Sequence, residues 1–316
     1  GSRGRPMVNL IALDADEKVT AILPVTEDDK QNDNSYVFFA TASGMVKRVQ
    51  LSQFKNLRAN GLRAVELNDG DNLIGVAITD GEQDIMLFSN EGKAIRFNES
   101  KIRAMGRTAK GVRGMRVRLL ANQGMEDDDT ELEDDSQDDQ DNDSVVAVSR
   151  VVSLVVAPQQ GEILCACERG FGKRTPVSDF PVKGRGGKGI IAIKTTARNG
   201  ELVQALAVTD ADDIVLISDA GTLVRTPVGQ IAQTGRNAQG VTLIRISQDE
   251  SLVSIALVEG GSEDELDEDS LEAALADNIA QDGTDLQDSA DLQDIELSEA
   301  LQQDGLLEAD AQQLDN

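Results

Sequence analysis

The chain of 316 residues contains no histidine and no tryptophan, and it has one tyrosine and two cysteines. Without histidine it lacks the commonest general base, and it cannot build a Ser-His-Asp site or a histidine metal site. Its densest carboxylates lie in low-complexity acidic runs, where no apolar pocket raises a carboxyl pKa. We therefore expect a chain without catalytic residues, metal sites or cofactors, and an enzyme is the weakest of three functional hypotheses.

Long hydrophobic runs are also missing. No apolar run reaches the roughly 18 residues that a membrane span needs, and no signal-peptide pattern opens the chain. Cys165 and Cys167 stand two residues apart, so they point to the same face of a strand and are too local to form a disulfide comfortably. We expect both thiols to pack in a core, and we expect a cytoplasmic protein without a membrane contact.

Bases are absent from two acidic segments, which dominate the formal net charge of -27. Residues 126–143 hold 12 acids and residues 262–316 hold 19, which leaves 26 acids and 30 bases in the rest of the chain. A mildly basic body with acidic appendages is typical of proteins that bind nucleic acid. For each segment, an acidic run that only solvates the chain is the alternative.

Three sequence elements repeat along the chain. The first is an apolar strand with a turn glycine and an arginine four residues later, and it occurs at Gly44 and Arg48, Gly92 and Arg96, Gly170 and Arg174, and Gly221 and Arg225. Because glycine permits the positive φ of a tight turn, each copy predicts a β-hairpin. The second element begins at a glycine and occurs five times, as GRPMVNL, GLRAVEL, GVRGMRV, GIIAIKT and GVTLIRI. The third is an apolar strand that follows each copy of the second.

The spacing of the second element predicts the architecture. Its glycines are separated by 57, 50, 78 and 51 residues, and the longest interval contains the acidic insert 126–143. About 50 residues with four short strands per unit indicate a radial array of small sheets that bury their faces against each other. We expect an all-β, propeller-like domain at 1–261, with a partial blade at 1–33, four-stranded blades at 34–82, 83–160, 161–211 and 212–261, and a largely disordered acidic tail at 262–316.

Cations recur in the loop before each second-element glycine, in the stretches LRANG, GRTAKG, GRGGKG and GRNAQG. Equivalent positions in a radial array lie around one rim, so cations there can bend a duplex by contacting phosphates rather than bases. Glycines let the backbone approach and offer N–H groups to phosphate oxygens. The predicted DNA-binding residues are Arg48, Arg58, Arg63, Arg96, Arg103, Arg107, Lys110, Arg113, Lys173, Arg174, Lys183, Arg185, Gly186, Gly187, Lys188, Arg225 and Arg236.

The repeated hairpins, GRPMVNL and the stretches RAMGRTAKGVRGMRV and SDAGTLVRTPVGQIAQTGRNAQGVTLIR resemble the C-terminal domain of bacterial DNA gyrase A, from Gly4 to about Glu259. The resemblance implies a β-pinwheel with strand exchange between neighbouring blades. It implies that duplex DNA wraps around the positive rim, so that ATP-driven strand passage introduces negative supercoils in a holoenzyme with the rest of gyrase A and with gyrase B. The catalytic tyrosine and the metal-using domains of gyrase have no counterpart in this sequence. We expect a non-catalytic part of the enzyme, truncated at its N-terminus within the domain.

The signature box of this family is matched only in part. The box, Gln-Arg-Arg-Gly-Gly-Lys/Arg-Gly, is similar to KGRGGKG, where Arg185 to Gly189 match and Lys183 and Gly184 do not. The family carries the box in its first blade, whereas this match lies in the fourth of five units. We interpret it as a paralogous loop and expect weaker wrapping than with the true box.

Two alternatives stay open beside this resemblance. The C-terminal domain of the DNA-cleaving protein of topoisomerase IV, with fewer blades and a degenerate box, belongs to the same functional class. A protein-docking propeller would explain the repeats but not the recurring cations, and the Trp-Asp repeat signature is absent.

The resemblance also suggests a role for the acidic segments, because gyrase A proteins of this kind end in an acidic tail that tunes wrapping. A polyanion can occupy a basic rim in competition with phosphate. We expect the tail at 262–316 to contact the rim and modulate wrapping, and the insert at 126–143 is a candidate for the same role.

Overall fold

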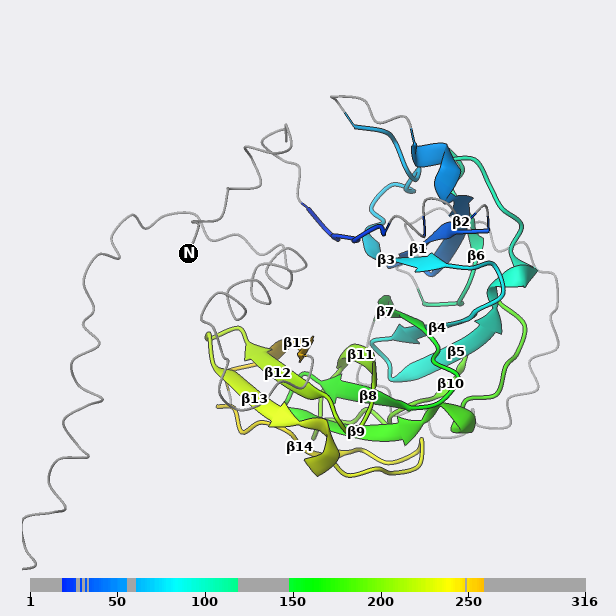
Figure 1. Cartoon of the computed structure of the whole chain (residues 1–316). Helices are drawn as coiled ribbons and strands as arrows, with labels where there is room; N and C mark the ends of the chain where they lie inside the picture. The colour runs from blue at the N-terminus through cyan, green and yellow to red at the C-terminus, as the bar shows by residue number, and fades with distance from the viewer. Residues whose placement is uncertain are drawn as a thin grey trace, which may run out of the picture. The chain divides into compact units, whose positions relative to one another are not determined.

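The computed structural model describes residues 19–26, 29, 32, 34–55, 61–118, 148–247 and 249–258, and within them the strands form four antiparallel sheets (Figure 1). Each sheet is built on a hairpin: β1 (Tyr36–Thr41) with β2 (Met45–Gln50), β4 (Asp84–Ser89) with β5 (Lys93–Asn98), β8 (Glu162–Cys167) with β9 (Phe171–Pro176), and β12 (Asp213–Ser218) with β13 (Leu223–Pro227). The four hairpins that the turn glycines predict are therefore confirmed.

A third strand pairs with the first strand of each hairpin: β3 (Leu73–Thr79), β7 (Val151–Val156), β11 (Leu202–Val208) and β15 (Leu252–Val258). These are the inner strands of the sheets, and they contact one another in succession, β3 with β7, β7 with β11, and β11 with β15. A short 3-10 helix follows each hairpin: η2 (Leu51–Phe54), η3 (Glu99–Lys101), η4 (Val177–Asp179) and η5 (Val228–Gln230).

The fourth strand of a sheet comes from the unit that follows it in the sequence. β6 (Val112–Arg113) pairs with β2, β10 (Ile190–Ile191) with β5, and β14 (Val241–Thr242) with β9, and each begins one residue after a second-element glycine. This exchange confirms the all-β, propeller-like pinwheel, with three four-stranded sheets and a last sheet of three strands in the described part of the chain. The exact unit boundaries stay a prediction, because each four-stranded sheet draws on two units.

Apolar layers between neighbouring sheets form the core. Along β4, Ile85 and Leu87 join a cluster with the first sheet, whereas Met86 and Phe88 join a cluster with the third. Successive side chains of a strand point to opposite faces. The strand is therefore buried at every position after its first, and β1, β8 and β12 show the same pattern. Aliphatic side chains fill these layers, as the scarcity of aromatic residues requires.

The two cysteines lie in the layer between the second and third sheets. Cys165 and Cys167 are both 0% exposed, and neither forms a disulfide. Burial raises the pKa of Cys165 to about 12 and also raises the pKa of Cys167, so both thiols are protonated at neutral pH. The prediction that these residues pack in a core is confirmed.

The exchanged strand approaches some turn glycines more closely than others. Gly92 has a φ of 76°, and a Cβ there would overlap the carbonyl oxygen of Ile193 from the next unit. Gly221 has a φ of 84°, and a Cβ there would meet nothing within 4 Å. These two glycines therefore separate the cost of the backbone conformation from the cost of the close approach.

We expect Gly92→Ala to lower the free energy of unfolding by about 3 kcal/mol or more, since the left-handed conformation costs an alanine about 1–2 kcal/mol and overpacking costs a similar amount. Gly221→Ala should cost only the conformational part, about 1–2 kcal/mol. Denaturant titration of both variants measures the difference. Equal losses at the two positions would contradict the close packing of the exchanged strand against Gly92.

Candidate nucleic-acid interface

The basic loops lie along the outer edges of the sheets, opposite the inner strands (Figure 1). Each loop leaves a 3-10 helix and runs along the second hairpin strand of the preceding sheet before it becomes the exchanged strand. Equivalent hydrogen bonds from a loop N–H to a strand carbonyl fix this path, with the pairs Met105–Arg48 at 2.9 Å, Lys183–Arg96 at 2.8 Å and Thr234–Arg174 at 2.9 Å. The loops therefore occupy the same place on three successive sheets, as the repeats predict.

Neighbouring loops are joined to each other along this outer edge. The guanidinium of a loop arginine donates to a backbone carbonyl of the preceding unit at three equivalent places, Arg107 to Arg63 at 3.4 Å, Arg185 to Arg113 at 3.0 Å and Arg236 to Ile191 at 3.0 Å. Backbone N–H groups add a second contact between the same segments, from Glu66 to Ala109, from Arg116 to Gly187 and from Lys194 to Ala238. Segments 61–66, 102–116, 180–194 and 231–242 thus form one continuous strip, which we call the rim track.

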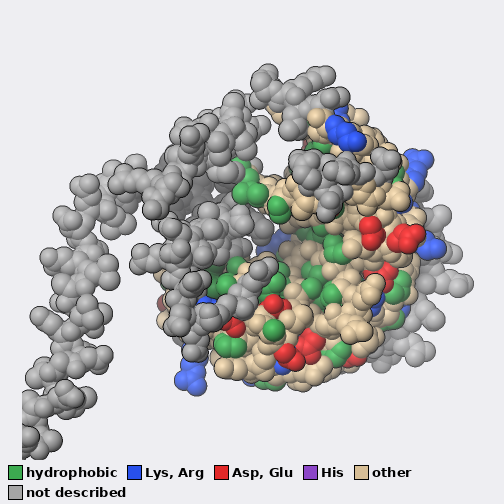
Figure 2. Space-filling model, viewed as in Figure 1, with side chains coloured by type: hydrophobic (Ala, Val, Ile, Leu, Met, Phe, Trp, Pro, Cys, Tyr) green, Lys and Arg blue, Asp and Glu red, His purple; other side chains and the backbone are tan. Residues whose placement is uncertain are grey.

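Cations line the rim track. Among the predicted DNA-binding residues, those exposed on it are Arg63, Arg103, Lys110, Lys183 and Lys188, and those partly exposed are Arg107, Arg113, Arg185 and Arg236. Figure 2 shows Lys and Arg side chains mainly at the periphery of the face in view. Gly186 and Gly187 lie on the same loop, but the N–H of Gly186 already donates to Gly114, at 2.6 Å. Arg58 lies outside the described residues.

The predicted arginines of the hairpins are held in ion pairs instead. The pairs are Arg96–Asp84 at 2.8 Å, Arg174–Glu162 at 2.6 Å and Arg225–Asp213 at 2.6 Å, and Arg174 also pairs with Asp210. In the first three pairs the acid opens the hairpin 12 residues before the arginine. Tyr36 takes that place before Arg48, whose guanidinium lies 4.7 Å from the ring centroid. The 12-residue spacing is visible in the sequence, and it is the signal that could have found these pairs.

These guanidiniums also bind carbonyl oxygens around the 3-10 helix of the next unit. Arg96 donates to Val177 and Phe180 at 3.1 and 3.2 Å, and Arg174 donates to Ile231 at 2.7 Å. The geometry therefore gives the hairpin arginines a structural role, in which each clamps one unit onto the next. A DNA contact by Arg48, Arg96, Arg174 or Arg225 stays a prediction, and we leave these residues out of the rim track. Lys173 is fully buried.

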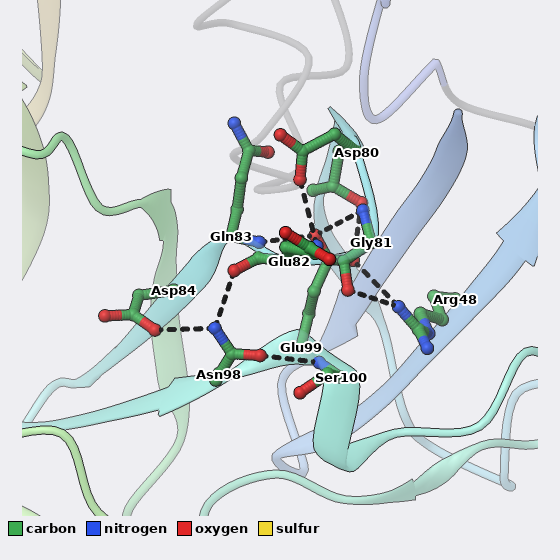
Figure 3. A network of polar contacts seen from close by, with 10 residues as sticks. Arg48, Asp80, Gly81, Glu82, Gln83, Asp84, Asn98, Glu99 and Ser100 are labelled. Atoms are coloured by element: carbon green, nitrogen blue, oxygen red, sulfur yellow. Dashed lines mark hydrogen bonds and ion pairs between the residues drawn. The ribbon is translucent and has the colours of Figure 1, made fainter. Parts of the chain in front are cut away.

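Glu99 is the centre of a buried polar network beside the rim track (Figure 3). It lies in η3, at the position that apolar residues occupy in the other units, namely Leu51, Val177 and Val228. Its carboxylate accepts hydrogen bonds from the Thr79 hydroxyl at 2.7 Å and from the N–H groups of Gly81 and Gln83 at 2.9 and 3.1 Å. It also lies 3.5 Å from the Arg48 guanidinium. One carboxylate thus joins the first sheet, the linker 80–83 and the start of a basic loop.

Chemically, the rim track offers guanidinium and ammonium groups, which bind phosphate oxygens through charge-assisted hydrogen bonds. No group of three or more potential metal-ligating side chains occurs among the described residues. None of the helices in the described ranges has the length and apolar character of a membrane span. The acidic insert 126–143 and the tail 262–316 lie outside the described residues, and so does any contact they make.

Comparison with known proteins gives a family match across the repeats. The model of the DNA gyrase C-terminal domain, β-propeller, matches residues 35–80, 83–130, 161–210 and 212–259. The chain is 47% identical over 275 residues to the DNA gyrase A protein of Haemophilus influenzae, which covers 86% of this chain and 31% of the relative. It is 47% identical over 268 residues to the DNA gyrase A protein of Escherichia coli, which covers 84% of this chain and 27% of the relative. The chain therefore spans about a third of the length of the curated relatives it matches.

Two solved structures share the fold. The DNA gyrase A C-terminal domain aligns with a TM-score of 0.61 at 23% identity, over 81% of this chain and 75% of that one. The C-terminal domain of DNA topoisomerase IV aligns with a TM-score of 0.67 at 24% identity, over 85% of this chain and 75% of that one. At these identities the likeness shows the fold alone, and this fold is the pinwheel that the sequence predicts.

Proposed function

The chain belongs to the DNA gyrase C-terminal β-propeller family, and on this basis we propose that its rim track binds duplex DNA without regard to sequence and bends or wraps it. The observation that carries the proposal is the continuous strip of cationic loops on the outer edges of three successive sheets, joined by equivalent hydrogen bonds. A duplex carries one negative charge per about 1.7 Å of its axis, so cations repeated along the strip release counterions from successive phosphates. Phosphate contacts position a duplex without reading its bases.

Bending follows from the way the sheets repeat. The sheets pack against each other through their central and inner strands, whereas the loops lie at the outer edges. A duplex that touches several loops follows the turn from one sheet to the next, and its deformation is compensated by the additional phosphate contacts. Wrapping therefore needs no base-specific contact.

We extend the proposal to the gyrase holoenzyme. The chain would be a non-catalytic part of the gyrase A protein, within an ATP-dependent type II topoisomerase in the cytoplasm, and it would need no cofactor of its own. With the rest of gyrase A and with gyrase B, it would support negative supercoiling. The curated relatives at 47% identity are DNA gyrase A proteins. They favour gyrase over topoisomerase IV, and the row of cations favours DNA over a docked protein.

We also propose that the acidic tail 262–316 modulates wrapping. Its 19 acids and the absence of any base make it a polyanion that can compete with phosphate for the rim track. Competition of this kind weakens as salt is added, because salt screens exposed charges.

A linking-number assay tests wrapping directly. The chain is mixed with relaxed circular DNA, a separate type I topoisomerase removes the remaining torsional strain, and the deproteinised DNA is resolved on a gel. We expect a shift of one sign that grows with protein concentration and disappears above about 0.3 M salt, where phosphate contacts are lost. Binding without a change in linking number would contradict wrapping, and no binding at about 50 mM salt would contradict the whole proposal.

A further inference from the structure

Two lysines lie directly beneath the rim track, where no ligand can reach them. Lys47 of β2 is 1% exposed and Lys173 of β9 is 0% exposed. Each stands three residues after the turn glycine of its hairpin, so the two positions are equivalent. Within the described ranges, neither ammonium group forms an ion pair with a carboxylate. Buried ammonium groups need other acceptors.

The acceptors of Lys47 are backbone carbonyls of the rim track. Its Nζ donates to Arg107 at 2.5 Å and to Ala109 at 3.0 Å, both on the loop 102–111. It also donates to Ala64 at 2.7 Å, on the preceding segment 61–66. All three N–H donors of one ammonium are therefore used on two neighbouring segments of the track.

Lys173 repeats this arrangement two sheets further along. Its Nζ donates to the carbonyls of Gly235 at 2.6 Å and Arg236 at 2.8 Å, both on the loop 231–240. The Thr175 hydroxyl, 3.2 Å away, is the third acceptor. The same side chain therefore anchors the same stretch of loop in two different units.

The sheet between them supplies a natural comparison. Ile95 takes the equivalent position in β5 and is 4% exposed. The loop above it, 180–189, is rich in glycine, and a Cβ on Gly187 would lie 3.8 Å from the Ile95 side chain. This loop packs on an apolar side chain, so the lysines are not a requirement of the fold at this position.

We infer that Lys47 and Lys173 are positioning residues for DNA binding, and that each fixes one basic loop of the rim track through carbonyl oxygens of that loop. The inference rests on the proposed function. A loop that is ordered before binding loses less conformational entropy when it meets phosphate, so anchoring raises affinity without a direct contact. The buried charges also add to the positive potential of the track.

The titration of these lysines provides a second observable. Burial lowers the pKa of each from 10.5 to about 8. No charged group contributes to the shift of Lys47. Lys173 faces Cys165 and Cys167 of β8, Arg236 of the loop and Asp179 of η4, and after burial the largest influence is Cys165, which raises its pKa. Loss of a proton leaves an amine with two donors, so one acceptor loses its partner above about pH 8.

The test compares Lys47→Met with Ile95→Met in the whole chain, because both place the same side chain at equivalent positions. We expect Lys47→Met to weaken binding to a mixed-sequence duplex about tenfold and to speed amide exchange in the loop 102–111 about tenfold, with β4 and β8 unchanged. Ile95→Met should change both quantities less than about twofold. For the unmodified chain, affinity should fall as pH rises from about 7 to 9.5, and this arm needs no variant to fold.

Three outcomes decide between the proposals. Wild-type affinity and loop exchange in Lys47→Met would overturn the positioning role, and so would a wild-type affinity that stays constant through pH 9.5. A lower unfolding midpoint with unchanged affinity would show a merely structural lysine and would also overturn it. If the unmodified chain fails to bind duplex at about 50 mM salt, the proposed function fails, and exchange in the loop 102–111 alone decides whether Lys47 holds that loop.

Discussion

Glu99→Ala is expected to lower the free energy of unfolding by about 3–5 kcal/mol. The change leaves the mostly buried Arg48 guanidinium, the Thr79 hydroxyl and the N–H groups of Gly81 and Gln83 without their acceptor. Removing one member of a buried ionic network costs far more than an exposed substitution, because the remaining groups stay desolvated. Chemical denaturation of the purified chain measures the loss.

Two matched variants separate the charge from the hydrogen bonds. Glu99→Gln keeps one acceptor oxygen and removes the charge, so it should cost about 1–2 kcal/mol. Glu82→Ala changes an exposed carboxylate on the adjacent linker and should stay within about 0.5 kcal/mol of the parent. If Glu99→Ala lost less than about 1 kcal/mol, the network in Figure 3 would not hold the two units together.

Replacing Lys110 and Lys183 together by glutamine is expected to weaken duplex binding roughly 50-fold at about 0.1 M salt. Both side chains are exposed on the rim track, on loops of successive sheets. Each phosphate contact contributes a factor of about 8 at this salt concentration, since the affinity scales with salt to a power of about -0.9 per contact. Fluorescence anisotropy with a labelled duplex of mixed sequence measures the change.

The control for this double variant removes the same charge elsewhere. Arg150 directly precedes the inner strand β7, and Arg169 lies in the turn between β8 and β9, so both are exposed away from the rim track. Arg150→Gln with Arg169→Gln should weaken binding less than about threefold. A similar loss in both double variants would mean that net charge, rather than the rim track, governs binding.

The repeats were sufficient to predict the hairpins, the third strands and the common position of the basic loops. Glycines such as Gly44 and the apolar alternation around them are local signals, and local signals survive folding. The exchange of strands was implied only by the family resemblance, because the partner of a two-residue strand such as β6 lies more than 60 residues away from it in the chain. No local pattern specifies that pairing.

Individual cations were harder to assign. The recurring cations predict both Arg174 and Lys173 on the rim, yet one is clamped by Glu162 and the other is enclosed by carbonyls 62 and 63 residues further along the chain. A charged residue in a strand gives no direction by itself. The acid 12 residues before the arginine would have predicted the ion pair, because antiparallel pairing across a short hairpin places these two side chains near each other. The carbonyl cages had no such signal.

The most direct test of the central claim is the salt dependence of duplex binding by the parent chain, the Lys110/Lys183 variant and the Arg150/Arg169 variant. If the rim track binds phosphates, the slope of log affinity against log salt should become shallower by about 1.8 in the first variant, about 0.9 for each lost contact. It should stay unchanged in the second. Equal slopes for the parent chain and the Lys110/Lys183 variant would contradict the account, since they would show that these cations do not face DNA.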